Sequence, residues 1–264
     1  MTGPASLISW SCKIFARVPL IYGHRGASAY APENTLAAFR LALNQGADGV
    51  ELDVTLSADE VPVVIHDDTV DRTTDGTGRV DRLTLAELKR LDASAPGRFG
   101  NQFAGERIPS LDEVFLGLPK FALINVELKR DTSPGRQLAA EVVALVRAYG
   151  LGARVWFSSY FYDNLRRVKQ LAPNLPVGLL YDPAEPLRIP WAWLCPGVQA
   201  QAHHPYYRLV GALTLRWWRW RGYRVYAWTV NTEPDLRRMM ELGVSGVITN
   251  YPDVAVRVRR DLGE

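Results

Sequence analysis

Short strand-like runs alternate with amphipathic helical segments along most of this 264-residue chain. The eight runs are rich in β-branched and aromatic side chains, and they cover residues 19–24, 49–56, 121–128, 153–159, 176–181, 197–202, 223–230 and 245–249. Between them, segments such as ENTLAAFRLALNQG place apolar residues at helical spacing and end on a glycine. Strands that alternate with helices form a parallel sheet. Eight such units predict a (β/α)8 TIM barrel, and an open doubly wound sheet is the alternative.

One segment departs from this alternation, because only SADE separates the run at 49–56 from a second run, VPVVIH. Four residues are too few for a parallel crossover, so the two runs should form an antiparallel hairpin. A turn centred on the middle of SADE sets Glu51 opposite His66 and Asp53 opposite Val64. The hairpin is therefore expected to bring a histidine beside a pair of carboxylates.

The long segment that follows the hairpin is predicted to be an inserted subdomain after the second strand, at about 67–118. It contains turn residues in TTDGTG and two helical patterns, at 84–91 and 110–116. We predict one barrel domain over residues 19–264, and we assign no role to an N-terminal extension of residues 1–18.

Composition excludes several other classes of protein. With 47% hydrophobic and 22% charged residues, the chain is neither disordered nor fibrous, and a formal charge of +3 is too small to indicate a nucleic-acid partner. Cys12 and Cys195 are its two cysteines, which make no disulfide framework. No stretch has the roughly 18 apolar residues of a membrane span, and residues 1–20 lack a signal-peptide pattern. We expect a cytoplasmic protein, whose oligomeric state stays open.

Ionisable side chains gather at the predicted C-terminal strand ends, where barrels carry their reactive groups. His24 ends the first run, Glu51 and Asp53 share one face of the second, and Glu127 lies near the end of the third. Three converging carboxylates either raise one another's pKa or hold a cation. Oxygen ligands select a hard ion, so we predict one divalent cation, Mg²⁺ or Ca²⁺.

The groups around this cation suggest a reaction. His24 and His66 suit general acid and base catalysis because imidazole titrates near neutral pH, and Arg25 and Lys129 suit an anionic phosphate ester. The combination indicates metal-assisted cleavage of a phosphodiester. Simpler interpretations stay open, since Arg25 could pair with Glu33 and the arginine would then be a structural strut.

Five motifs in this order and spacing carry a family resemblance, namely HRG, PENT, ELDV, IHDDT and VELK, with GVITNYPD near the C-terminus. Together they resemble the glycerophosphodiester phosphodiesterases from about Leu20 to the C-terminal helix. The resemblance implies hydrolysis of glycerophosphodiesters, such as glycerophosphocholine or glycerophosphoethanolamine, to sn-glycerol 3-phosphate and an alcohol. It implies these roles: acid/base catalysis by His24 and His66, metal binding by Glu51, Asp53 and Glu127, and phosphate contact by Arg25 and Lys129.

Two other functions are kept as alternatives. A lysophospholipase D or a sphingomyelinase-D-like barrel shares the histidine pair and the Glu-x-Asp, although Lys129 two residues after Glu127 and the long insertion favour the first interpretation. A non-catalytic barrel that binds metal or phosphate is less favoured, because every predicted catalytic residue is present.

Three aromatic or histidine-rich features remain. Trp228 is assigned to the substrate pocket, with packing inside the barrel as the alternative, and His203 and His204 follow the run at 197–202 as either loop or pocket residues. In LRWWRWRG, a helix beginning near Pro205 would place two sets of side chains: Leu209, Leu213, Trp217 and Trp220 against the barrel, and Arg216 and Arg219 in solvent. Trp218 would be left over for a weak contact with a lipid surface.

Overall fold

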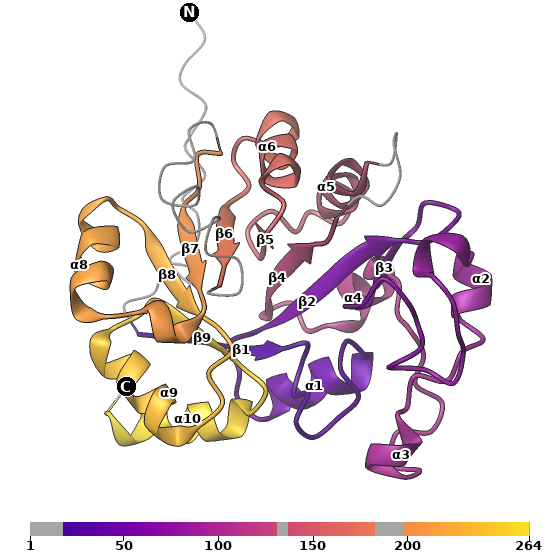
Figure 1. Ribbon diagram of the computed structural model, residues 1–264, viewed down its shortest axis with the longest axis horizontal. Coiled ribbons are helices and arrows are strands. Elements are labelled where there is room, and N and C mark those ends of the chain that lie inside the picture. Colours follow the sequence, from indigo (N-terminus) through magenta and orange to yellow (C-terminus); the bar gives the residue numbers. More distant parts are fainter. Residues whose placement is uncertain (1–17, 131–136, 183–197, 264) are drawn as a thin grey trace, which may run out of the picture.

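The structure is a computed structural model that describes residues 18–130, 137–182 and 198–263. Eight parallel strands close into a barrel, because β1 pairs with both β9 and β2, and helices surround it (Figure 1). The predicted (β/α)8 TIM barrel is confirmed. The strands are β1 (Leu20–His24), β2 (Gly49–Leu56), β3 (Pro62–Val64), β4 (Leu123–Leu128), β5 (Val155–Ser159), β6 (Val177–Tyr181), β7 (Ala202–Pro205), β8 (Arg224–Ala227) and β9 (Gly246–Thr249).

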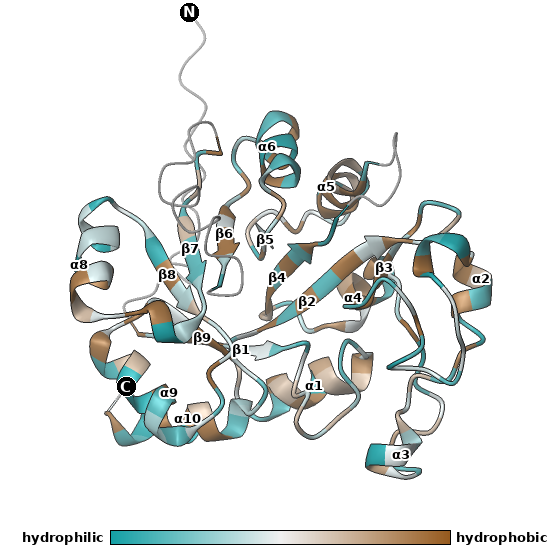
Figure 2. Ribbon diagram, in the orientation of Figure 1, coloured by the Kyte–Doolittle hydropathy of each residue, from teal (hydrophilic) through white to brown (hydrophobic). Residues whose placement is uncertain are grey.

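Helices follow most strands and cover the outside of the barrel. The α-helices are α1 (Leu36–Asn44), α2 (Leu85–Leu88), α3 (Pro96–Phe99), α4 (Leu111–Gly117), α5 (Leu138–Ala148), α6 (Tyr162–Leu171), α8 (Ala212–Trp220), α9 (Glu233–Leu242) and α10 (Pro252–Asp261), and the 3₁₀ turns are η1 (Val80–Arg82) and η2 (Tyr207–Leu209). In Figure 2, β4 and β6 are largely hydrophobic, whereas α6 and α9 are largely hydrophilic on the outside. The main apolar core therefore lies between the strands and the helices.

Strand alternation separates the two faces of the barrel wall. On β2, Val50, Leu52 and Val54 belong to the core under the helices, while Glu51 and Asp53 point to the other side, into the barrel. The lower interior of the barrel is filled by a second, aromatic-rich cluster, made of Leu20, Tyr22, Leu123, Trp156, Ala202, Tyr226 and Ile248. The polar residues of β2 thus lie above an apolar floor.

The loop after β1 packs tightly on α1. Gly26 has φ +84°, and a Cβ atom there would lie 2.5 Å from the backbone carbon of Ala38, so a larger residue would push the loop away from the helix. At the start of α1 the Thr35 hydroxyl accepts a hydrogen bond from the Ala38 amide. These contacts fix the loop that carries the HRG motif.

The predicted hairpin is present, but its predicted register is wrong by one residue. Val54 pairs with Val64, so Asp53 does not face Val64, and Glu51 does not face His66. The turn has three central residues instead of two: the Ser57 amide donates to the Val61 carbonyl, and Glu60 takes a left-handed φ of +60°. Because β3 ends at Val64, His66 lies outside the paired part of the hairpin. Its position is set by the path of the backbone that leaves β3.

The segment between β3 and β4 contains η1, α2, α3 and α4 and has a small apolar cluster of its own, which includes Val70, Val80 and Leu88. Both α2 and α4 begin with a capping box, in which Thr84 or Ser110 exchanges hydrogen bonds with a glutamate three residues later. The whole segment between β3 and β4 lies at one side of the barrel in Figure 1. Of the predicted N-terminal extension, residues 1–17 lie outside the described part of the chain.

Residue 197 of the strand predicted at 197–202 lies outside the described residues, and the prediction is wrong for residues 198–201, since β7 is formed by Ala202–Pro205. The alternation in GVQAQA favours a strand, but the ladder positions are set by β6, which pairs Gly178 with Ala202 and Tyr181 with Pro205. The Gln201 side chain instead accepts a hydrogen bond from the Val177 amide. His203 and His204 therefore lie inside a buried strand and do not follow one.

The orientation predicted for LRWWRWRG is only partly right. Leu209 and Trp217 pack against the core, and Arg216 and Arg219 are exposed, as expected. The prediction is wrong for Leu213, Trp218 and Trp220. Residues 207–209 form η2, and α8 begins only at Ala212, which changes the face that meets the barrel. Leu215 and Trp218 are buried, whereas Leu213 and Trp220 are 80% and 77% exposed. Trp218 is thus unable to contact a lipid surface. Within the described chain, no helix has the length and apolar character to cross a membrane.

Candidate active site

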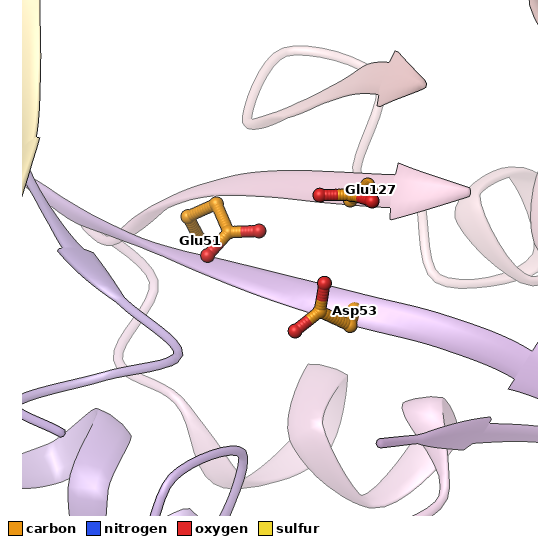
Figure 3. Close-up of side chains that lie close together, drawn as sticks. All are labelled: Glu51, Asp53 and Glu127. Carbon is orange, nitrogen blue, oxygen red and sulfur yellow. The ribbon is translucent and has the colours of Figure 1, made fainter. Parts of the chain in front are cut away.

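Three carboxylates from two adjacent strands converge inside the barrel. Glu51 and Asp53 lie two residues apart on β2, and the β2–β4 register places Glu127 beside Asp53. One oxygen of each lies within 4.8 Å of the others, and all three side chains are buried. Figure 3 shows the three groups turned towards the same space. Such a cluster of oxygen ligands fits a hard divalent cation.

The charges of this cluster are only partly compensated by nearby cations. Burial, followed by the charges of Asp53 and Glu127, raises the pKa of Glu51 well above its usual value. Burial also raises the pKa of Glu127. Burial alone would raise the pKa of Asp53 too, but the cations of Lys129 and Arg25 outweigh it and lower that pKa. The two glutamates are therefore the groups that gain most from an added cation.

His24 lies at the C-terminal end of β1 and is held by an asparagine after β9. Its Nδ1 is 2.7 Å from Asn250 Oδ1, and its Nε2 is 4.0 Å from Glu51 Oε2. Burial, followed by the Arg25 charge, lowers the pKa of His24 to about 4. Since an amide oxygen can only accept, the geometry favours a neutral imidazole that donates from Nδ1 and keeps a free lone pair on Nε2.

His66 is held by the aspartate that follows it. Its Nδ1 lies 2.6 Å from Asp67 Oδ1, so this nitrogen donates to the carboxylate and Nε2 is left for the pocket. Arg72 in turn contacts Asp67 Oδ2 at 2.6 Å and both carboxylate oxygens of Glu33 at 2.8 Å. This chain of ion pairs ties the imidazole to the loop that precedes α1.

Arg25 and Lys129 both contact the carboxylates. Lys129 Nζ lies 2.8 Å from Asp53 Oδ1 and 2.6 Å from Glu127 Oε1. Arg25 Nη1 donates to Glu33 Oε1 at 2.8 Å, Arg25 Nε lies 3.2 Å from Asp53 Oδ2, and its backbone N–H donates to Glu51 Oε2. The arginine is therefore a structural strut in this structure, as one interpretation of the sequence expected, and it also lines the pocket.

A single pocket of about 390 Å³, measured out to its open mouth, brings most of these groups together. Seven of the eight predicted site residues line it, namely His24, Arg25, Glu51, His66, Glu127, Lys129 and Trp228, while Asp53 lies buried behind them. Trp228 directly follows β8, donates from Nε1 to the His204 carbonyl oxygen at 2.8 Å, and meets Tyr160 edge to face. The wall opposite the carboxylates is thus partly aromatic.

Sequence reasoning missed four residues that hold the site in place. Asn250 orients His24, Asp67 orients His66, Arg72 holds Asp67, and Asn34 Nδ2 donates to Asp53 Oδ2 at 2.8 Å. All four lie in or beside the motifs GVITNYPD, IHDDT and PENT. Their side chains act through other side chains, so charge and spacing alone gave no signal for them.

The model of the Glycerophosphoryl diester phosphodiesterase family matches residues 24–254. The chain is 41% identical over 246 residues to a glycerophosphodiester phosphodiesterase of Caldanaerobacter subterraneus, which covers 92% of this chain and 99% of that relative. It is 34% identical over 253 residues to a glycerophosphodiester phosphodiesterase of Bacillus subtilis, with 91% and 86% covered.

A solved structure of an Oleispira antarctica phosphodiesterase, in complex with the product sn-glycerol-3-phosphate, superposes with a TM-score of 0.84 at 31% identity and covers 93% of this chain and 98% of that one. The fold, the cluster of acidic and histidine side chains, and these matches over nearly the whole chain agree. The chain belongs to the glycerophosphoryl diester phosphodiesterase family.

Proposed function

We propose that this protein hydrolyses glycerophosphodiesters, such as glycerophosphocholine or glycerophosphoethanolamine, to sn-glycerol 3-phosphate and an alcohol. The observation that carries the proposal is one pocket that holds three buried carboxylates and two histidines, each histidine oriented by a partner through Nδ1. A relative of the same fold has been solved with sn-glycerol-3-phosphate as product, which supports the choice of substrate.

The charge of the pocket supports a requirement for one divalent cation. With three carboxylates ionised, Arg25 and Lys129 leave one net negative charge, which would repel a phosphodiester anion. Glu51, Asp53 and Glu127 would hold the cation, and their oxygen atoms favour Mg²⁺ or Ca²⁺. When bound, the cation would neutralise the phosphoryl oxygens and stabilise the charge that develops on them.

The two histidines have different surroundings, which supports different roles. We infer that His24 is the general base, because its Nδ1 donates to the Asn250 amide and its Nε2 lone pair is free. His66 would be the general acid, because its Nδ1 is held by the Asp67 carboxylate at 2.6 Å and its Nε2 is left to face the leaving alcohol.

In this scheme His24 takes the proton of the glycerol 2-hydroxyl, whose oxygen attacks phosphorus and forms a cyclic phosphate. The bond to the alcohol oxygen breaks, and His66 protonates that oxygen. Water then opens the cyclic phosphate to sn-glycerol 3-phosphate, and each histidine reverses its role.

The leaving group can separate the two roles. The 4-nitrophenyl ester of glycerol 3-phosphate releases a stable phenolate and hardly needs an acid. His66→Ala should therefore lose far less activity on this ester than on glycerophosphocholine, whereas His24→Ala should lose activity on both. The opposite pattern would exchange the roles, and equal losses for both variants on both substrates would reject the assignment.

The activity itself is tested by a head-group panel. Glycerophosphocholine, glycerophosphoethanolamine and glycerophosphoglycerol are incubated with the protein in EDTA and then with Mg²⁺ or Ca²⁺ restored, and sn-glycerol 3-phosphate is measured. We expect turnover only with metal. A protein that binds the cation but hydrolyses none of these diesters would be the non-catalytic barrel.

A lysophospholipase D activity is the second candidate, and a feature of α8 favours it. Leu213 and Trp220 are exposed among Arg216, Arg219 and Arg221, and the described part of the chain from 206 to 232 has no acidic residue. Such a surface suits a weak contact with anionic lipid. Release of choline from lysophosphatidylcholine faster than from glycerophosphocholine would select this activity.

The cellular setting is proposed from composition. A cytoplasmic location agrees with the presence of only two cysteines in 264 residues, and a charge of +3 gives no reason to expect nucleic acid. Detection of the tagged protein in the soluble cytoplasmic fraction would support this location, and recovery outside the cytoplasm would contradict it.

A further inference from the structure

The two adjacent histidines of β7 point to opposite faces of the barrel wall. His203 and His204 are 1% and 0% exposed. The His203 ring stacks on Trp218 of α8 at 5.5 Å, so it lies between the sheet and the helix. The His204 ring lies 4.5 Å from Trp156 and 5.4 Å from Tyr226, inside the barrel. Both imidazoles are thus buried on the same strand, but His203 faces α8 and His204 faces the interior of the barrel.

The His204 imidazole has hydrogen-bonding capacity that the described residues do not use. Neither Nδ1 nor Nε2 finds a partner among them. A buried donor or acceptor without a partner costs free energy, and an imidazole so placed usually meets a ligand or ordered water. His204 also lines the active-site pocket, so its ring borders the space that a substrate would enter.

The described neighbours of His204 enclose its ring without hydrogen-bonding either nitrogen. Asn125 and Ser158 also line the pocket, and the Ser158 hydroxyl donates to Asn125 Oδ1 at 3.2 Å. On the neighbouring strand, a Cβ atom at Gly178 would lie 2.6 Å from His204 Nε2, so a glycine is required to leave room for the ring. The imidazole is therefore accommodated by its neighbours without being hydrogen-bonded by them.

The chemistry of this imidazole selects one part of a glycerophosphodiester. Burial, followed by the charge of His203, lowers the pKa of His204 to about 3, so the ring is neutral at physiological pH, with one donor and one acceptor nitrogen. A hydroxyl group also donates and accepts once. The phosphate has Arg25 and Lys129 as its candidate partners, and a cationic head group finds no charge at His204.

We propose that His204 binds the terminal hydroxyl of the glycerol moiety and makes the enzyme selective for diesters that carry it. This inference rests on the proposed glycerophosphodiesterase activity. The selective group is the hydroxyl on the glycerol carbon farthest from the phosphate, because the 2-hydroxyl is used as the nucleophile beside His24.

The test compares two substrates on three proteins. Glycerophosphocholine carries both hydroxyls, whereas 2-hydroxypropyl phosphocholine keeps the 2-hydroxyl and lacks the terminal one. The wild-type kcat/KM should be about tenfold higher for glycerophosphocholine, as expected for one neutral hydrogen bond in a buried site. His204→Phe should lower kcat/KM for glycerophosphocholine about tenfold and leave the analogue within about twofold, so that the preference disappears.

His203→Phe is the matched control, because it makes the same chemical change one residue away on the other face of β7. It should keep the wild-type preference. A His204→Phe variant that retains the tenfold preference, or that loses activity on both substrates equally, would overturn the role. His204→Gln, which restores a donor and an acceptor, should recover part of the preference.

A measurement on the wild-type protein keeps the inference testable if the variant fails to fold. As competitive inhibitors of glycerophosphocholine hydrolysis, sn-glycerol 3-phosphate should bind about tenfold more tightly than 2-hydroxypropyl phosphate. Equal inhibition by the two compounds would refute the inference while leaving the activity intact. Absence of metal-dependent turnover of glycerophosphocholine by the wild type would instead reject the proposed function, and the role of His204 with it.

Discussion

Lys129 is the group whose loss should change the stability of the barrel most clearly. Its ammonium contacts Asp53 at 2.8 Å and Glu127 at 2.6 Å, and all three side chains are largely shielded from solvent. Lys129→Met would leave two buried carboxylates without this cation. Breaking a buried ion pair by removing one partner costs about 3 to 5 kcal/mol. For a chain of this length, that corresponds to a fall in melting temperature of roughly 10 °C.

A divalent cation should reverse much of this loss, since it would supply the missing positive charge. In EDTA we expect the full difference between wild type and Lys129→Met. With saturating Mg²⁺ both proteins are stabilised by binding, and the difference between them should shrink by about 1.4 kcal/mol for each tenfold by which the variant binds the cation more tightly. Differential scanning calorimetry of both proteins in both buffers measures this.

Lys169 provides the control for a buried lysine outside the site. Its ammonium donates to the carbonyl oxygens of Pro173 and Leu175, at 3.1 and 2.8 Å, and contacts no carboxylate among the described residues. Lys169→Met should destabilise the protein equally with and without Mg²⁺. A loss of less than about 1 kcal/mol by Lys129→Met in EDTA, or a deficit that Mg²⁺ leaves unchanged, would show that Lys129 does not compensate the buried carboxylates.

Three further outcomes follow from the site and from α8. His24→Ala and His66→Ala should each lower kcat on glycerophosphocholine by about 10² to 10⁴-fold, and retention of more than a tenth of the activity would contradict acid/base catalysis. Because burial and the neighbouring carboxylates raise the pKa of Glu51, protons compete with the cation. Mg²⁺ affinity, measured by calorimetry, should therefore fall as the pH is lowered through that raised pKa, and an affinity that does not fall on acidification would refute this. The double variant Leu213→Ser, Trp220→Ser should lose co-sedimentation with phosphatidylglycerol vesicles, binding that high salt should also weaken.

A second pair of exposed apolar residues controls the vesicle experiment. Leu116 and Phe121 are 66% and 59% exposed near the β4 end of the insertion. The double variant Leu116→Ser, Phe121→Ser removes a similar apolar surface away from the arginines of α8, so its vesicle binding should equal that of the wild type. Equal loss in both double variants, or binding to neutral vesicles alone, would exclude a specific contact through α8.

The sequence predicted the barrel and the convergence of the site because both follow from simple periodicities. Alternation along a strand is enough to place Glu51 and Asp53 on one face, and parallel strands bring Glu127 and His24 to the same end of the barrel. To predict the carboxylate cluster and the shared pocket, the order of the strands was the only long-range information needed.

The sequence predictions were wrong where a neighbouring segment, rather than the local residue pattern, sets the register or the limits of an element. A three-residue turn with Glu60 in the left-handed region shifted the hairpin by one position, and pairing with β6 set the limits of β7. On α8, the late helix start buried Trp218 and exposed Trp220. Asn250 and Asp67 escaped notice because each acts by orienting a histidine, a role that only the folded geometry reveals.

Two sectors of the barrel line the pocket, and they supply different kinds of side chain. The ionic and proton-transferring groups come from β1, β2, β4 and the residues that follow these strands and β3. The rest of the wall is lined by Ser158 of β5, Leu180 of β6, His204 of β7, Trp228 directly after β8, and Ile248 of β9. Substitutions in the second sector can change which alcohol or polyol is accepted without altering the bond-breaking groups. A library confined to that wall is thus a rational starting point for redirecting the enzyme to new phosphodiesters.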